Sequence, residues 1–352
     1  MRLQFAPYVL NFKQPAGTSR GVMTEKITAF LRIFDEKEPE NYGLGEASIF
    51  PGLSPEADDR YFYKVVELVN NVKLGLPTDL SRFPSLQFGF EQCLRDFAEG
   101  CRGIYFDSPF IHGNSEIEIN GLVWMGDIDT MMQRIKEKIS EGFRCIKLKI
   151  GAIDWASEVR MIEFIRESYS ADRLEIRVDA NGGFNMDNVL PRLNRLASLD
   201  VHSIEQPIPQ GSPDLMEFLC KVSPVPIALD EELIGKYTLE EKEKTLDVIK
   251  PQYIVLKPTL TGGFSGAMEW IRLARNRGIG WWITSALESN IGLNALAQWV
   301  ATLGQTRPQG LGTGALFTNN LSSPLELKGD HLVYNPSLSI DRNQINALDW
   351  RD

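Results

Sequence analysis

The chain has 352 residues, of which 43% are hydrophobic and 24% charged, a composition that excludes disordered, collagen-like and disulfide-scaffold proteins. Asp and Glu number 47 against 37 Lys and Arg, and this net charge of −10 excludes nucleic acid as a partner, because binding phosphates needs clustered cations. No apolar stretch approaches the ~18 residues that a membrane-spanning helix needs, so we expect no membrane partner either.

The cysteines and the N-terminus indicate the compartment. Cys93, Cys101, Cys145 and Cys220 are scattered without a C-x-x-C pair, which argues against a zinc knuckle and a disulfide framework. The first dozen residues read as a strand, and they lack the cationic start and continuous apolar core of a signal peptide. We therefore expect a reduced, cytoplasmic protein.

Residues 1–115 predict a small α+β domain. Extended segments with polar connections suited to hairpins come first, and two segments with apolar residues at helical spacing follow them. The extended segments are residues 3–12, 25–35 and 42–48, and the helical segments are residues 55–73 and 84–99.

Residues 116–324 show a different pattern, in which short apolar runs alternate with amphipathic helices. This alternation is typical of repeated βαβ units, and the number of runs favours an α/β barrel over an open doubly wound sheet. No G-x-G-x-x-G motif follows a run, which argues against a dinucleotide-binding fold. The tail, 325–352, is expected to pack back on the N-terminal domain and complete it. The predicted strands are residues 122–126, 143–150, 174–179, 202–205, 226–230, 253–257, 280–285 and 310–313.

Several predicted helices have recognisable ends. Asp127 can cap a helix that stops at Gly142. Ser212 precedes a proline at the start of another helix, and Thr238 and Glu241 have the spacing of a capping box. These signals fix the positions of the crossovers between the predicted strands.

Charged residues interrupt the otherwise apolar strands, and each lies at the carboxyl end of its strand, where barrel active sites are built. A single carboxylate at such a place is more often a turn or helix cap, and a single Lys-x-Lys is more often a solvated strand edge. Interruptions at five corresponding strand ends favour a functional site instead. The residues are Lys147 and Lys149, which face the same way, and Asp179, Glu205, Asp230 and Lys257.

The three carboxylates predict a divalent metal site. Placed at one rim they repel one another, and a hard cation such as Mg²⁺ with oxygen ligands relieves that repulsion. Zinc is disfavoured, because the histidines, His112, His202 and His331, lack metal-ligand spacing.

The lysines predict proton abstraction next to a carboxylate. They come from strands on either side of the carboxylates, which places ammonium groups on both sides of a bound metal. The metal would bind a substrate carboxylate and a lysine would remove the adjacent proton. Lys147, with the same orientation as Lys149, would favour the neutral form of Lys149 that acts as a base.

The order Lys-x-Lys, Asp-x-Asn, Glu, Asp-Glu, Lys resembles the muconate-lactonizing subgroup of the enolase superfamily. Residues 43–52 are similar to that superfamily's capping segment. Within the subgroup, residues 284–293 and 309–314 most resemble the o-succinylbenzoate synthase family. The resemblance implies a modified TIM barrel, (β/α)₇β, with an N-terminal α+β capping domain. It also implies Mg²⁺, for which Mn²⁺ can substitute, and dehydration of 2-succinyl-6-hydroxy-2,4-cyclohexadiene-1-carboxylate to o-succinylbenzoate in menaquinone biosynthesis.

The resemblance also implies a role for each matching residue. Lys149 would be the catalytic base, Lys257 would offset charge from the opposite face, and Lys147 would tune Lys149. Asp179, Glu205 and Asp230 would bind the metal, with Asn181 and Glu231 supporting them. Glu232 stands where many relatives have serine, which leaves a neighbour of Asp230 as an alternative ligand. The candidate substrate-binding residues are Arg177, Ser285, Ser289, Gly312, Gly314 and Arg20.

Other functions stay open at this point. The two lysines would also serve an N-succinylamino acid racemase or a dipeptide epimerase, and muconate cycloisomerisation is a third alternative. Dipeptide epimerases usually carry Asp-x-Asp near the last strand, where this chain has Gly312-Thr-Gly314. A non-catalytic metal-binding or scaffolding protein is disfavoured, because both lysine positions are intact. The expected partner is a small-molecule carboxylate, and a homo-oligomer is compatible with the sequence.

Overall fold

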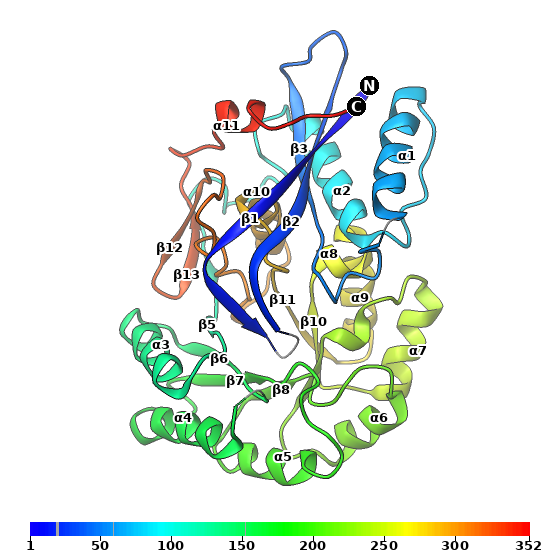
Figure 1. Cartoon of the computed structure of the whole chain (residues 1–352). Helices are drawn as coiled ribbons and strands as arrows, with labels where there is room; N and C mark the ends of the chain where they lie inside the picture. Colours follow the sequence, from blue (N-terminus) through cyan, green and yellow to red (C-terminus); the bar gives the residue numbers. More distant parts are fainter. Residues whose placement is uncertain (19–20, 59, 152) are drawn as a thin grey trace.

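The computed structural model describes residues 1–18, 21–58, 60–151 and 153–352, which form an antiparallel sheet domain over a curled parallel sheet (Figure 1). Arg20, a candidate substrate-binding residue, lies outside the described residues. The two chain ends lie close together at the outer end of the sheet domain (Figure 1). Within the described part of the chain, no helix is long and apolar enough to cross a membrane.

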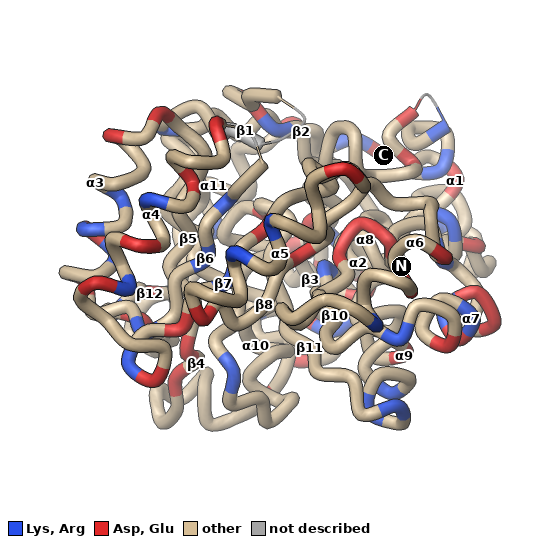
Figure 2. The backbone as a smooth tube through the Cα atoms, turned by 90° about the horizontal axis from the view of Figure 1, so that it is seen from below, with Lys and Arg blue, Asp and Glu red and all other residues tan. Residues whose placement is uncertain are grey.

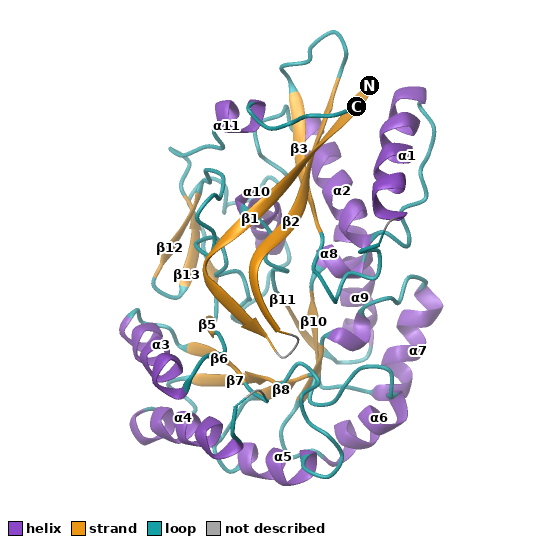
Figure 3. Ribbon diagram, in the orientation of Figure 1, coloured by secondary structure: helices purple, strands orange, loops and turns teal. Residues whose placement is uncertain are grey.

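The capping domain is built on β1 (Arg2–Thr18), β2 (Gly21–Phe34) and β3 (Tyr42–Ser48), which pair in that order and antiparallel. The three predicted extended segments are confirmed, but the first two are longer than predicted. The segment expected to be a polar connection continues the hairpin, with a register irregularity between Asn11 and Ala16. The hairpin therefore extends from the sheet toward the strands of the barrel (Figure 3).

The two predicted helices form, as α1 (Arg60–Leu74), which begins later than predicted, and α2 (Pro84–Ala98), and both pack against this sheet. Their apolar residues pack with strand residues in one core, which includes Leu3, Leu31, Val65, Leu68 and Leu86. Gly45 and Gly89 allow α2 to approach β3 closely, because a Cβ on Gly45 would lie 2.1 Å from the Gly89 carbonyl oxygen.

Asp96 links α2 to the sheet and gives this domain a predictable pH dependence. The buried carboxylate accepts hydrogen bonds from the backbone N–H groups of Leu44 and Gly103, at 2.9 and 2.7 Å. Burial raises its pKa from 3.8 to about 6 despite these bonds. The folded state therefore binds this proton more tightly than the unfolded chain does, a difference of ~3 kcal/mol. That contribution is complete below pH ~4 and is lost as the pH rises through about 6.

We therefore expect thermal unfolding from pH 4 to pH 7 to show a loss of stability for the native chain that Asp96→Asn lacks. The measurement is the difference in unfolding free energy between the two proteins at each pH, which cancels the other titrating groups. A difference that stays constant across this range would contradict the expectation.

The parallel sheet lies below the capping domain, and over the described residues it contains seven strands in the order β11-β10-β9-β8-β7-β6-β5. Each strand lies next to its neighbour in sequence, which confirms the barrel-type βαβ order. The strands are β5 (Gly121–Val123), β6 (Cys145–Lys149), β7 (Glu175–Asp179), β8 (Ser203–Glu205), β9 (Ile227–Leu229), β10 (Tyr253–Leu256) and β11 (Gly280–Ile283).

The eighth predicted strand, 310–313, does not form. Isolated parallel bridges join Thr284 to Gly310 and Gln309 to Ile119, so this segment links the two edges of the sheet without a strand of its own. A Cβ on Gly310 would lie 2.1 Å from Thr284 Oγ1, so the close approach requires glycine there. Gly310 and Gly312 also leave few side chains in this segment to pack as a strand would.

Helices surround the parallel sheet and bury one side against it (Figures 1 and 3). Asp127 caps its helix through the N–H of Thr130, and Thr238 and Glu241 form the predicted capping box. Ser212 precedes its proline as predicted but makes no side-chain cap. The helices are α3 (Ile128–Ser140), α4 (Trp155–Ser168), α5 (Val189–Ala197), α6 (Pro213–Val222), α7 (Leu239–Ile249), α8 (Pro258–Thr261), α9 (Gly263–Asn276) and α10 (Asn290–Ala301), with a 3₁₀ turn at Glu231–Leu233.

The tail divides between the two domains, which differs from the prediction that all of it completes the capping domain. Strands β12 (Leu325–Lys328) and β13 (His331–Tyr334) pair with β4 (Ile117–Glu118) beside the barrel. Only the last part, with α11 (Arg342–Asn346), returns to the capping sheet, where Arg351 bridges Phe5.

Charge is spread over the outside of the molecule. Seen from below, blue and red segments alternate along the outer helices (Figure 2).

The four cysteines are all buried, and none forms a disulfide bond.

Candidate active site

The site residues form a row across the inner face of the parallel sheet. Lys149, Asp179 and Glu205 are register partners on three consecutive strands, so their side chains point the same way. Asp230 directly follows β9, and Lys257 directly follows β10. Sequence spacing alone predicted this convergence at the carboxyl ends of the strands, and the structure brings these residues together.

Ion pairs connect each lysine to the carboxylates. Lys147 Nζ lies 2.9 Å from Asp179 Oδ2 and 2.5 Å from Glu205 Oε2. Lys149 Nζ lies 2.6 Å from the same Asp179 oxygen, and Lys257 pairs with Asp230. The two lysines of the Lys-x-Lys motif therefore share one carboxylate oxygen.

Burial makes the charges of this cluster interact strongly. The three carboxylates are at most 2% exposed. Burial alone would lower the pKa of Lys147, but the charges of Asp179 and Glu205 raise it well above its ordinary value. Burial and the nearby charge of Asp179 raise the pKa of Glu205 well above its ordinary range. The repulsion among the three buried carboxylates therefore shows most clearly in the raised pKa of Glu205.

The donor set fits a hard divalent cation. In the described part of the chain, no group of three or more His, Cys, Asp and Glu side chains is already arranged around a metal position. The lysine ammonium groups instead pair with the carboxylates. Glu205 Oε1 is buried without a hydrogen-bond partner, and a buried oxygen in this state lacks compensation for its lost hydration. Oxygen donors from three adjacent strands, with one of them unsatisfied, suit Mg²⁺.

Asn181 contacts Lys149, and Glu231 contacts Asn181 in turn. Asn181 Oδ1 accepts from Lys149 Nζ at 2.8 Å, and its Nδ2 donates to Glu231 Oε1 at 3.0 Å. Asn181 has the left-handed φ of 44°, a conformation in which asparagine is enriched. Glu232 instead accepts from the N–H of Gly211, which makes Asp230 the better ligand candidate.

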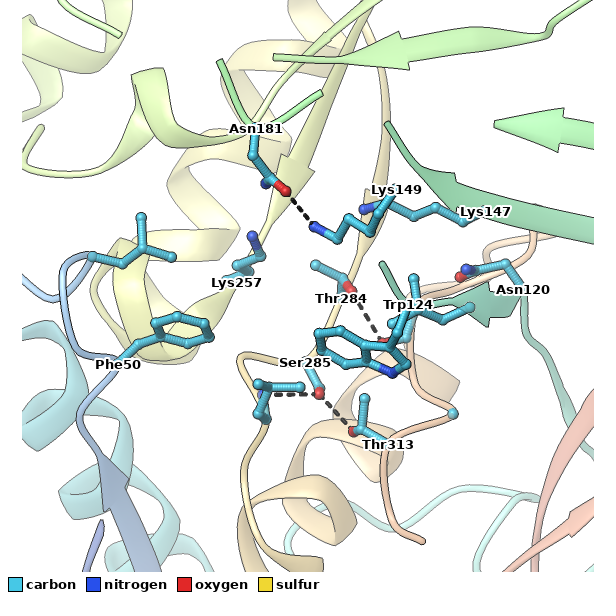
Figure 4. Close-up of a pocket in the computed structure, with 15 residues that line it drawn as sticks. Phe50, Asn120, Trp124, Lys147, Lys149, Asn181, Lys257, Thr284, Ser285 and Thr313 are labelled. Atoms are coloured by element: carbon cyan, nitrogen blue, oxygen red, sulfur yellow. Dashed lines mark hydrogen bonds between the residues drawn. The ribbon is translucent and has the colours of Figure 1, made fainter. Parts of the chain in front are cut away.

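A pocket opens above this cluster, and Figure 4 shows Lys149 of β6 and Lys257, which follows β10, reaching it from different sides. One part of its wall is apolar and the other is polar, which suits a ring with polar substituents. The lining residues are Phe50, Leu53, Asn120, Leu122, Trp124, Lys147, Lys149, Asn181, Lys257, Thr284, Ser285, Leu287, Gly310, Gly312 and Thr313.

Sequence reasoning missed part of this lining. Phe50 and Thr313 lie in segments that the resemblance singled out, and Trp124 lies in the first predicted barrel strand. Nothing in the local sequence marks their side chains as facing a pocket. Ser285 and Gly312 do line it, and Ser285 Oγ lies 2.6 Å from Thr313 Oγ1 (Figure 4).

Three candidate substrate-binding residues lie elsewhere. Arg177 lies one pleat deeper in the barrel, paired with Glu175 at 2.6 Å and stacked on Trp282. Ser289 is buried, caps α10 and donates to Glu46 at 2.6 Å. Gly314 is not among the pocket-lining residues either. The structure adds no support for Arg177 and Ser289 as substrate-binding residues, because their side chains are bound within the protein.

Comparison with known proteins identifies the family. Residues 130–334 match the family model described as enolase C-terminal domain-like. An o-succinylbenzoate synthase from Desulfotalea psychrophila is 46% identical, covering 94% of this chain and 98% of that protein. The crystal structure of MenC from Desulfotalea psychrophila LSv54 superposes with a TM-score of 0.85 at 42% identity, covering 95% of this chain and 99% of that one. An N-succinylamino acid racemase from Thermus thermophilus is more distant, at 30% identity over 83% of this chain and 79% of that protein. As its motifs predicted, the chain belongs to the enolase superfamily and, within it, to the o-succinylbenzoate synthase family.

Proposed function

We propose that this chain dehydrates 2-succinyl-6-hydroxy-2,4-cyclohexadiene-1-carboxylate to o-succinylbenzoate, the product that its family name gives, as a step of menaquinone biosynthesis. One observation carries the proposal beyond family membership. Lys149 of β6 and Lys257, which follows β10, reach one pocket above three converging carboxylates, and the pocket has an apolar wall that suits a ring.

Lys149 acts as the base and then as the acid. Its neutral amine takes the proton from the ring carbon that bears the carboxylate. The electrons of that C–H bond form the last double bond of the aromatic ring, and the C–O bond to the hydroxyl breaks. The Lys149 ammonium returns the proton to the departing hydroxide, so water leaves. Lys147 holds its ammonium group beside Asp179 and Glu205, whose charges raise its pKa despite burial.

Lys257 stabilises charge on the other side of the substrate. Asp230 holds its ammonium group at the pocket floor. Burial alone would lower its pKa, but the charges of Asp230 and Glu205 raise it, so the group stays cationic. A fixed cation beside a carboxylate that gains negative charge during the reaction lowers the barrier.

Asp179, Glu205 and Asp230 would hold Mg²⁺, or Mn²⁺ in its place, as the family's divalent metal. When bound, the cation would supply positive charge that stabilises negative charge developing on the substrate, in addition to the lysine charges that pair with the carboxylates. Asn181, held by Glu231, then keeps Lys149 directed into the pocket.

The pocket wall orients the ring. Phe50, Trp124 and Leu287 provide apolar surface and keep water from the reacting carbon. Ser285, Thr313 and the backbone at Gly312 are the polar groups available to the substrate's carboxylates. We place the protein in the cytoplasm, in agreement with its four free cysteines.

A racemase of N-succinylamino acids is the second candidate, because the Thermus thermophilus relative has that name and two lysines in one pocket suit proton transfer on opposite faces. The test is incubation with the cyclohexadiene carboxylate and Mg²⁺, followed by ultraviolet absorbance as the ring becomes aromatic. A parallel polarimetric assay follows N-succinylamino acids.

We expect rapid aromatisation, with racemisation absent or at least ~10-fold lower in kcat/KM, a ratio that corresponds to ~1.4 kcal/mol of transition-state stabilisation. Racemisation without aromatisation would overturn the proposed function and favour the second candidate. Protein without added metal and with a chelator serves as the control for background reaction.

A further inference from the structure

We propose that Lys26 of the capping domain is a positioning residue that holds the turn 285–288 of the barrel against the substrate. This inference rests on the proposed function for the identity of the substrate, and on the geometry for the rest. Lys26 belongs to β2, far in sequence from the catalytic lysines, and it lies outside the pocket lining.

The contacts of Lys26 end on the backbone of this turn. The residue is 1% exposed, and its Nζ donates to the carbonyl oxygen of Leu287 at 2.7 Å and to that of Ala286. The same ammonium group lies 5.7 Å from the centroid of the Phe50 ring. Lys26 thus contacts two residues, Leu287 and Phe50, that line the pocket from opposite domains.

The turn needs such support because its backbone is strained. Leu287 has a φ of 62°, a conformation that costs a residue with a side chain ~1 kcal/mol or more. Ser285 Oγ accepts from the N–H of Leu287 at 3.2 Å, and Glu288 Oε2 accepts from the N–H of Ala286 at 2.8 Å. A strained backbone conformation persists where contacts with the surrounding structure hold it in place. Lys26 provides two such contacts from the capping domain, its hydrogen bonds to the carbonyl oxygens of Ala286 and Leu287.

Two buried carboxylates balance the charge of Lys26. Glu288 lies on the turn itself, and Glu46 on β3 interacts electrostatically with both Lys26 and Glu288. Glu46 also accepts from the N–H groups of Ser289 and Gly292, each at 2.9 Å, at the start of α10. Burial lowers the pKa of Lys26 to about 8, so it is charged at neutral pH. Residues of the capping domain therefore bind the segment that follows β11 at two places, Lys26 at the turn and Glu46 at the start of α10.

Lys26 is therefore expected to affect substrate binding, whereas Lys149 and Lys257 act in the reaction itself. Lys149 and Lys257 come from β6 and the end of β10, and neither contacts Lys26. Loss of Lys26 frees Leu287 and Phe50, so the pocket loses its fixed wall while the catalytic cluster keeps its own bonds. Substrate binding then weakens more than the chemical step.

The test is Lys26→Met, which keeps the length and apolar stem but removes the ammonium group. We expect KM to rise at least ~10-fold and kcat to change less than ~3-fold, because the lost interaction affects binding and not the reacting atoms. Hydrogen–deuterium exchange of residues 284–292 should also increase. Glu288→Gln, a milder variant that keeps an acceptor for the Ala286 N–H, should raise KM in the same direction by less.

The matched control is Glu91→Gln, which disturbs a different contact between the domains. Glu91 of α2 accepts from the N–H of Phe264, at 2.6 Å, at the start of α9, and it does not line the active-site pocket. We expect it to lower thermal stability without raising KM. An equal rise of KM in Glu91→Gln, or an unchanged KM and exchange in Lys26→Met and Glu288→Gln, would overturn the proposal.

Failure of this inference and failure of the proposed function are distinguishable. Assays of the native protein first establish which substrate it turns over. The KM of each variant is then compared on that substrate. The exchange of residues 284–292 is measured without any substrate.

Discussion

Replacement of Lys149 by alanine is expected to reduce kcat at least ~10³-fold, because one side chain serves as both base and acid and each general acid–base contribution is worth ~10²–10⁴-fold. Lys147 cannot take over this role. Its ammonium is bound to Asp179 and Glu205, which raise its pKa despite burial. Lys257 directly follows another strand, β10, and is paired with Asp230.

The measurement is steady-state aromatisation of the cyclohexadiene carboxylate, with Mg²⁺ affinity measured on the same samples by calorimetry. Lys149→Ala should still bind Mg²⁺, because the three carboxylates are intact. Lys73→Ala, at an exposed lysine in the last turn of α1, is the matched control and should behave as the native chain does. A Lys149→Ala protein with native turnover would remove Lys149 as the base.

The centre of the site was predictable because it follows from two local regularities. Side chains two residues apart on a strand face the same way, which placed Lys147 and Lys149 together. The carboxyl ends of parallel strands meet at one rim, which placed Asp179, Glu205 and Asp230 together. Neither rule needs knowledge of distant contacts.

The remaining differences arise where a side chain's role depends on partners far away in sequence. Arg177 faces inward as its spacing predicted, but Glu175 and Trp282 bind it below the pocket. Ser289 has the right neighbours in sequence, yet Glu46, 243 positions away, binds it. Lys26 and Leu287 are 261 positions apart, and no local pattern marks a lysine that bonds to a distant carbonyl.

The eighth barrel strand shows the limit of apolar patterning. The segment at 310–313 has the apolar and small residues of a buried strand, but Gly310 serves a close approach to Thr284. The barrel closes there by isolated bridges. Closure therefore depends on the packing between the sheet edges and not on strand propensity.

Asp179→Asn should have the second large effect, on the metal. The variant keeps the shape of the side chain and removes one of the three negative charges proposed to hold Mg²⁺. Loss of a residue that supports a metal ligand costs ~10–100-fold in affinity, so loss of a ligand's charge is expected to cost at least ~10²-fold. Activity at low Mg²⁺ should fall with it.

Thermal unfolding gives a readout that does not depend on turnover. A ligand that binds only the folded state stabilises it by mass action, so Mg²⁺ should raise the Tm of the native chain and raise that of Asp179→Asn much less. Asp187→Asn, at an exposed position after the same strand, should keep the native response. An unchanged Mg²⁺ titration in Asp179→Asn would exclude Asp179 as a ligand. Asp179 also pairs with both Lys147 and Lys149. If the Mg²⁺ titration is unchanged but Asp179→Asn still loses activity at saturating Mg²⁺, that loss comes from the broken ion pairs between Asp179 and these lysines.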